Sequence, residues 1–192
     1  MVITTDVPCK GEAWYQIDQR LKDTFFKSLW EAFKLSMAIG ILYDKAAIDA
    51  SDYDDKVTIS RNTFMQHAEE ISYFFKTAVI TSKLVGFSEK DRLYLAFSED
   101  VTDEELESDE RDTLIQGVSE EALSFDKATF LKGFANFGAQ KLAACISNND
   151  NETMENIMDF LNDSYNGVTE ELLQMKELNE EFDLEFDDEV IE

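Results

Sequence analysis

The chain has 192 residues, of which 44% are hydrophobic and 12% aromatic, and its formal net charge is −25 at pH 7. This composition excludes an intrinsically disordered chain, because the apolar residues suffice for a core, and it excludes direct nucleic-acid binding by this chain alone, because the charge repels phosphate. Two cysteines exclude a disulfide framework, and no apolar run approaches the roughly 20 residues of a membrane span. We expect a soluble, cytoplasmic protein of one domain, or one domain and a tail.

The first half of the chain shows the apolar spacing of amphipathic helices. Apolar residues recur three and four positions apart, and the single proline and seven glycines leave few helix breakers. Helices are predicted over residues 12–22, 24–41, 60–83 and 88–97, with a short extended piece at 57–59. The expected N-terminal caps are Asp23 or Thr24, Ser60 or Asn62, and Ser88 with Asp91 in a capping box.

The second half is predicted to be helical as well. Asp126 or Ser124 starts a helix that runs to about residue 146, and its small residues, such as Gly138, let a neighbouring helix approach closely. A turn over residues 148–151 precedes a last packed helix, which carries apolar residues from Met154 to Tyr165. The predicted fold class is all-α: a compact, bundle-like helical domain over residues 1–167 and an acidic amphipathic helix and tail over 168–192.

The acidic charge is concentrated in the second half of the chain. Residues 1–92 hold 12 of the 17 basic and 14 of the 42 acidic residues, so nearly all of the net charge lies beyond residue 92. The densest stretches are residues 99–112, which we expect to be a solvated helix or a loop beside one, and residues 177–192; each carries nine carboxylates. Such a field attracts basic surfaces, which points to a protein partner.

Residues with catalytic or metal-binding chemistry are few and scattered. No glycine spacing matches a phosphate-binding loop, and His67, the only histidine, has no cysteine or second histidine nearby for a zinc site. Cys145 lies on an apolar helical face, which favours a core thiol over a nucleophile. The cluster of Asp49, Asp52, Asp54 and Asp55 could bind Ca²⁺ or Mg²⁺, but an EF-hand glycine and glutamate are absent. We therefore expect no catalytic residue, metal or cofactor.

The C-terminal segment alternates apolar and acidic residues in a way that a solvated tail does not need. This pattern is typical of segments that dock onto a basic, grooved partner, although the same side chains could cover the edge of the protein's own core. The predicted partner-binding residues are Leu172, Met175, Leu178, Glu181, Phe182, Asp183, Leu184, Glu185, Phe186 and Asp187.

Three stretches of the chain resemble a known family. They are the aromatic-rich residues 26–41, the short segment 91–97, and residues 130–142 followed by 155–161. These segments resemble the Dnd (DNA phosphorothioation) system-associated protein 4 type, a family of small bacterial defence accessory proteins. The resemblance covers about a third of the chain and implies an accessory role in antiphage defence or DNA-modification-dependent restriction.

Three functions remain open from the sequence. The leading hypothesis is a non-catalytic accessory subunit of a bacterial antiphage defence assembly, whose partner is a larger subunit with a basic surface: an SMC-like or other ATPase, or a nuclease. The second is an acidic DNA mimic or inhibitor, bacterial or phage-encoded, that occupies a DNA-binding cleft; the near-neutral first half speaks against it. The third is a Mg²⁺-dependent nuclease that uses the aspartates of residues 49–55.

Overall fold

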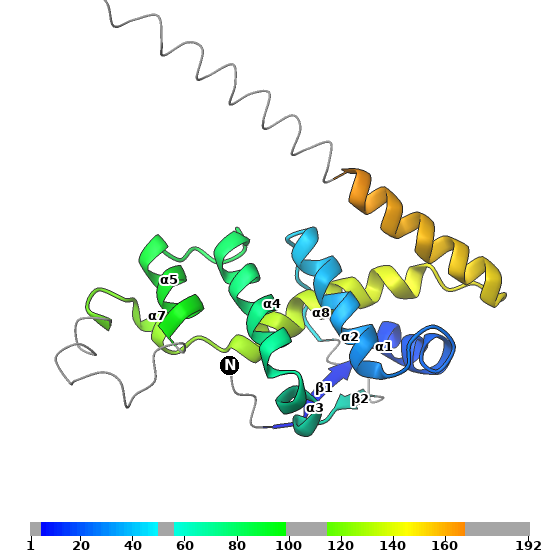
Figure 1. Ribbon diagram of the computed structural model, residues 1–192, viewed down its shortest axis with the longest axis horizontal. Coiled ribbons are helices and arrows are strands. Elements are labelled where there is room, and N and C mark those ends of the chain that lie inside the picture. Colours follow the sequence, from blue (N-terminus) through cyan, green and yellow to red (C-terminus); the bar gives the residue numbers. More distant parts are fainter. Residues whose placement is uncertain (1–4, 50–55, 99–114, 168–192) are drawn as a thin grey trace, which may run out of the picture. The chain divides into compact units, whose positions relative to one another are not determined.

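The computed structural model describes residues 5–49, 56–98 and 115–167, and the chain forms two compact units, residues 1–144 and 145–192 (Figure 1). The fold is mostly helical, as predicted, and the described residues also contain one two-stranded sheet. The elements of the first unit are β1 (Val7–Lys10), α1 (Glu12–Gln16), a π-helical turn η1 (Ile17–Leu21), α2 (Leu29–Leu42), β2 (Lys56–Ile59), α3 (Arg61–Gln66), α4 (Ala68–Thr81), α5 (Glu89–Phe97), α7 (Glu120–Leu123) and α8 (Lys127–Ala144). No helix among the described residues is both long enough and apolar enough to span a membrane.

Helices α2 and α8 form the centre of the first unit and pack against each other without intervening side chains at two points (Figure 1). A Cβ atom on Gly138 of α8 would lie 2.7 Å from the Cα of Ser36, and one on Gly40 of α2 would lie 2.7 Å from the Cα of Phe134. Only glycine permits backbones this close. The predicted close approach at Gly138 is thus confirmed.

Aromatic side chains fill the space between α8 and the helices beside it. The ring of Phe130 lies 4.9 Å from that of Phe134 and 6.2 Å from that of Phe75 on α4, both edge-on. On the other side of α2, the ring of Phe33 stacks between Trp14 and Trp30, with centroid separations of 5.8 and 5.9 Å. Edge-on and offset-stacked rings of this kind stabilise beyond their buried area.

The helix starts agree with the predicted caps in three cases and differ in one. Ser60, Ser88 and Asp126 accept hydrogen bonds from the first turns of α3, α5 and α8, and Ser88 forms the expected capping box with Asp91. The prediction that Asp23 or Thr24 caps the second helix is wrong, because α2 begins after Ser28. Asp23 adopts a left-handed conformation (φ 68°) in a turn closed by its hydrogen bond to the carbonyl of Phe26, which delays the helix.

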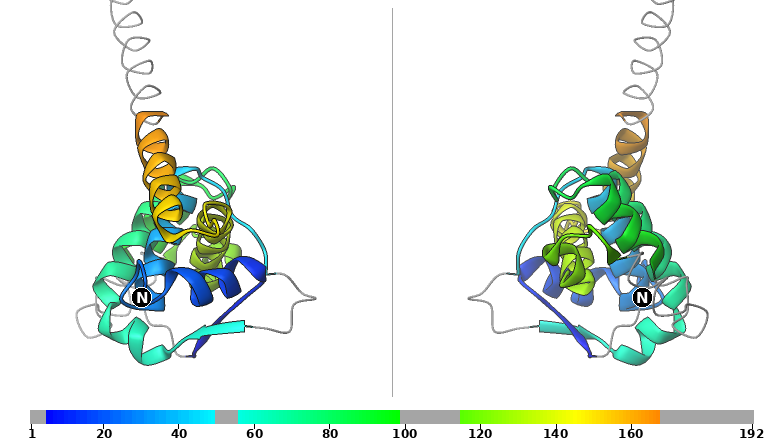
Figure 2. Two further views of the ribbon diagram at one scale, coloured as in Figure 1. Left: turned by 90° about the vertical axis from the view of Figure 1, so that its right-hand side faces the viewer. Right: turned by 90° about the vertical axis from the view of Figure 1, so that its left-hand side faces the viewer.

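The two strands form an antiparallel ribbon, the β1–β2 ribbon, that leads directly into α3 (Figure 2). The extended piece predicted at residues 57–59 is confirmed as β2. The strand β1 was not expected, because it depends on pairing with a strand about fifty residues away, which local spacing does not report. The helix predicted over residues 60–83 is broken at His67, where α3 ends and α4 begins.

The described part of the second unit consists of a turn and a helix. The hydroxyl of Thr153 accepts a hydrogen bond from the Ser147 amide at 3.0 Å, and the Asn156 side chain donates to the Cys145 carbonyl at 3.1 Å. Residues 150–167 are helical, in agreement with the predicted turn and last helix. Ile157 is buried as expected, but the predicted packing of Met154, Met158 and Tyr165 is wrong, because these side chains are exposed. The predicted domain boundary after residue 167 coincides with the end of the described residues and stays a prediction.

Candidate functional site

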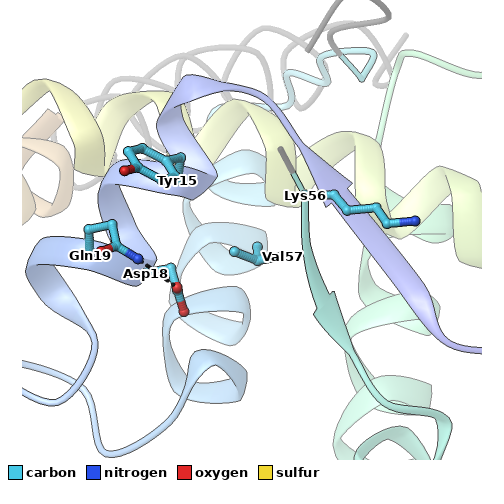
Figure 3. A pocket seen from close by; sticks show the side chains of 5 residues that line it. All are labelled: Tyr15, Asp18, Gln19, Lys56 and Val57. Carbon is cyan, nitrogen blue, oxygen red and sulfur yellow. Dashed lines mark hydrogen bonds between the residues drawn. The ribbon is translucent and has the colours of Figure 1, made fainter. Parts of the chain in front are cut away.

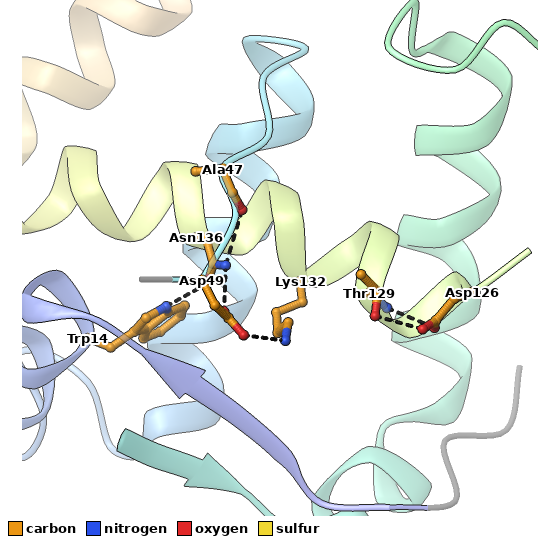
Figure 4. Close-up of polar contacts among 7 residues, drawn as sticks. All are labelled: Trp14, Ala47, Asp49, Asp126, Thr129, Lys132 and Asn136. Atoms are coloured by element: carbon orange, nitrogen blue, oxygen red, sulfur yellow. Dashed lines mark hydrogen bonds and ion pairs between the residues drawn. The ribbon is translucent and has the colours of Figure 1, made fainter. Parts of the chain in front are cut away.

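A polar cluster in the first unit joins the side chains of Trp14, Asp49, Lys132 and Asn136 and the carbonyl of Ala47 (Figure 4). Asn136, which is 4% exposed, accepts a hydrogen bond from the Trp14 indole at 2.8 Å and donates to the Ala47 carbonyl at 3.2 Å and to Asp49 at 2.9 Å. Buried polar groups cost free energy unless they are hydrogen-bonded, and Asn136 meets that requirement with three partners. The cluster connects the segment after α2 to α8 through these hydrogen bonds and the ion pair of Asp49 with Lys132.

Asp49 belongs to the aspartate cluster that the sequence offered as a candidate metal site. Its two carboxylate oxygens are engaged separately, Oδ1 by Asn136 at 2.9 Å and Oδ2 by the Lys132 ammonium at 2.7 Å. A metal ion would have to displace one of these donors. Asp52, Asp54 and Asp55 lie outside the described residues, and within the described ranges no three His, Cys, Asp or Glu side chains gather as metal ligands would.

The two thiols are both buried. Burial raises the pKa of Cys9 to about 12; Lys132 opposes this shift and Asp49 reinforces it. Burial also raises the pKa of Cys145. Because the thiolate is the reactive form, both environments favour the unreactive thiol, which agrees with the interpretation of Cys145 as a core residue.

His67 lies at the joint between α3 and α4 and contacts groups from two helices. Its ring stacks on that of Trp30 with a centroid separation of 4.8 Å, and its Nδ1 lies 2.8 Å from Glu70, which also accepts a hydrogen bond from Lys34 at 2.8 Å. The hydrogen bond from Lys34 lowers the pKa of Glu70 most, and the one from His67 lowers it further. These contacts connect α2 to α4, so they give His67 a structural role at the break between the two helices.

A hollow of about 220 Å³ lies between the first helical turns and β2 (Figure 3). We call it the edge pocket; its lining residues are Tyr15, Asp18, Gln19, Lys56 and Val57. Val57 is directed into it, whereas the Lys56 side chain extends the other way, across β1 (Figure 3). The volume is several times the ~30 Å³ of a liquid water molecule, but below the ~300–1,000 Å³ of pockets for drug-sized ligands. It suits one large side chain better than a substrate.

The predicted partner-binding residues are not among those that the structure describes. All of them, from Leu172 to Asp187, fall within residues 168–192. Residues 99–112, the other dense carboxylate stretch, also lie outside the described ranges. The assignment of these segments to partner binding therefore stays a prediction.

Sequence reasoning overlooked the polar cluster and the edge pocket. Asn136 is the one polar residue within the apolar and small-residue run 134–139, and a polar residue in that setting signals a buried hydrogen-bonded group. The pocket has no such signal, since its residues come from separate elements and belong to no motif. Comparison with known proteins adds nothing to either: no family model, curated protein or solved structure matches the chain.

Proposed function

We propose that the chain is a non-catalytic accessory subunit of a bacterial antiphage defence assembly. It binds a larger DNA-handling subunit, an SMC-like or other ATPase or a nuclease, through protein–protein contacts. The observation that carries this proposal is the uneven charge: nearly all of the net −25 lies beyond residue 92, and its C-terminal part alternates with apolar side chains. A segment of this kind suits a basic groove on a partner.

The contacts of the first unit support a binding role over a catalytic one. Three acidic side chains of the first unit are engaged within the fold: Asp49 with Lys132, Glu70 with Lys34 and Asp126 with Thr129. The sequence resemblance to defence accessory proteins supports the same assignment.

Removal of residues 178–192 tests the proposal. The deletion takes away eight carboxylates and the apolar side chains of Leu178, Phe182, Leu184 and Phe186. The truncated chain should keep its helicity and melting temperature, because termini without buried backbone tolerate truncation. Its binding to the larger subunit, which a pull-down from the native host with the full-length chain would recover, should weaken. Higher ionic strength should reproduce only the electrostatic part of that loss.

A matched pair of full-length variants separates the two contributions. One replaces the eight carboxylates by amides, and the other replaces the four apolar residues by serine. Both should weaken binding, and only the second should remain sensitive to salt. A truncated chain that loses helicity would show instead that these side chains belong to the protein's own core.

Competition with duplex DNA distinguishes the accessory role from DNA mimicry. An accessory subunit leaves the partner's DNA binding intact or promotes it. A mimic is displaced from the partner by DNA and blocks its DNA binding, and that result would replace the proposal.

A further inference from the structure

The helix over residues 150–167 in the second unit carries a row of large side chains on one face (Figure 1). Met154, Met158, Leu161 and Tyr165 follow one another at steps of four, three and four residues, which places them above one another along the helix. The side chains of Met154 and Met158 are 47% and 58% exposed, Tyr165 is also exposed, and Leu161 is half-buried. We call this row the 154–165 seam. Single exposed apolar residues are ordinary on a protein surface, but a contiguous row marks an interaction surface.

The spacing of the seam is that of a coiled coil. Alternating steps of four and three residues keep an apolar row aligned with a second helix over several turns. The same steps continue in the sequence at Val168, Leu172 and Met175, so apolar residues occupy seven successive seam positions between residues 154 and 175. A heptad pattern sustained over about three repeats argues for a coiled coil rather than for a chance row. The surface therefore fits a second helix of the same spacing.

The charges around the seam favour a second copy of this chain over a basic partner. Within residues 154–165 the positions directly beside the seam hold Glu155, Ile157, Asn162 and Ser164. One carboxylate in four is little attraction for a basic helix, whereas a chain with a net charge of −25 approaches its own copy best where charge is sparse. The exposed carboxylates of Asp159 and Asp163 lie on the helix face away from the seam, where two copies keep them apart.

We infer that the chain forms a homodimer in which the 154–165 seam of one copy packs against the same seam of a second copy. Methionine suits this interface, because its flexible thioether side chain fills irregular gaps. One consequence rests on the proposed function: Leu172 and Met175 continue the seam in the sequence, so binding of the larger subunit depends on residues 178–187 of both copies. Two such segments in one dimer raise the apparent affinity for a subunit with two basic grooves.

Sedimentation equilibrium of the purified full-length chain, without any partner, tests the inference. The wild type should be a dimer, and Met154→Ser with Met158→Ser should raise its dissociation constant at least about a hundredfold, because four methionines leave the interface. Both side chains are exposed in the single chain, so circular dichroism and the urea midpoint should stay as in the wild type. The matched control, Asp159→Ser with Asp163→Ser, should dimerise at least as tightly as the wild type. A wild type that is monomeric at about 100 μM, or equal dissociation constants for the two variants, overturns the inference.

The dependence on salt provides a second measurement. Higher ionic strength screens the repulsion between two acidic copies, so the dissociation constant of the dimer should fall or stay constant. Docking of carboxylates on a basic groove weakens under the same conditions, so the two kinds of contact respond with opposite sign. A dimer that dissociates as the salt concentration rises is held by charges and overturns the inference. Because no partner is present, these outcomes are independent of the proposed function, which fails separately if an intact dimer recovers no larger subunit.

Discussion

Substitution of alanine for Gly138 should separate the two central helices of the first unit. The added Cβ would overlap the carbonyl group of Ser36 and would lie only 2.7 Å from the Cα of the same residue. Overpacking of a core costs typically ~1–3 kcal/mol, and here both clashing groups are backbone, which cannot rotate aside, so the upper end applies. The better helix propensity of alanine offsets ~0.5–1 kcal/mol of this. The expected net loss is therefore about 2–2.5 kcal/mol in the free energy of unfolding.

Urea denaturation followed by tryptophan fluorescence measures this loss in the relevant unit, because both tryptophans, Trp14 and Trp30, lie in it. Two other glycines serve as controls. At Gly133 the added Cβ would lie 3.1 Å from the Ala46 Cβ, and at Gly86 nothing lies within 4 Å. Gly133→Ala should cost less than about 1 kcal/mol and Gly86→Ala should fall within about 0.5 kcal/mol of the wild type. A Gly138→Ala protein as stable as Gly86→Ala would refute the close packing of α2 on α8.

Three further predictions concern individual side chains. Asn136→Leu leaves the Trp14 indole and one carboxylate oxygen of Asp49 without their hydrogen-bond partner. It should therefore lower the free energy of unfolding by about 2–4 kcal/mol in the same urea assay. A urea midpoint equal to that of the wild type would contradict the polar cluster. Hydrogen bonds from the Thr129 amide and hydroxyl lower the pKa of Asp126 below 3.8, so the stabilisation that Asp126 provides is complete above that value and is lost as the pH falls through the folded-state pKa. In Asp126→Asn the midpoint of urea unfolding should therefore depend less steeply on pH below about 4 than in the wild type. An unchanged dependence on pH would refute the assignment. In a Cys145→Ser background, Cys9 of the native protein should react with a thiol reagent at pH 8 only when the fold opens locally, because Cys9 is buried with a pKa of about 12. The reaction should be at least about a hundredfold slower than that of the unfolded chain. A rapid reaction of the native protein would contradict the burial of Cys9.

The helical elements were predictable wherever a strong local signal coincided with tertiary packing. The apolar spacing of α2 and α8 and the capping box at Ser88 each appear in the sequence as they do in the structure. The start of α2 and the break at His67 could not be predicted, because a left-handed residue at position 23 and ring stacking on Trp30 decide them, and neither follows from helical periodicity. β1 depends on pairing with a strand about fifty residues away, which local spacing does not report.

The candidate sites divide in the same way. The acidic and apolar alternation of residues 182–187 is a property of the sequence and is visible there. The edge pocket is not visible in the sequence, because it combines residues of α1 and η1 with residues of β2, which lies about forty residues further along the chain. Asn136 could have been identified as a buried polar residue, but its partners at Trp14 and Asp49 are long-range contacts that only the fold brings together.

The mass of the assembly that contains the full-length chain in its own host tests the central claim most directly. The complex is purified at low salt and its mass and composition are determined by native mass spectrometry, and the preparation is then repeated at increasing ionic strength. The account predicts one larger ATPase or nuclease subunit in fixed stoichiometry with the chain, partly released as salt screens the carboxylates of the tail. Recovery of the chain alone at every salt concentration would contradict it.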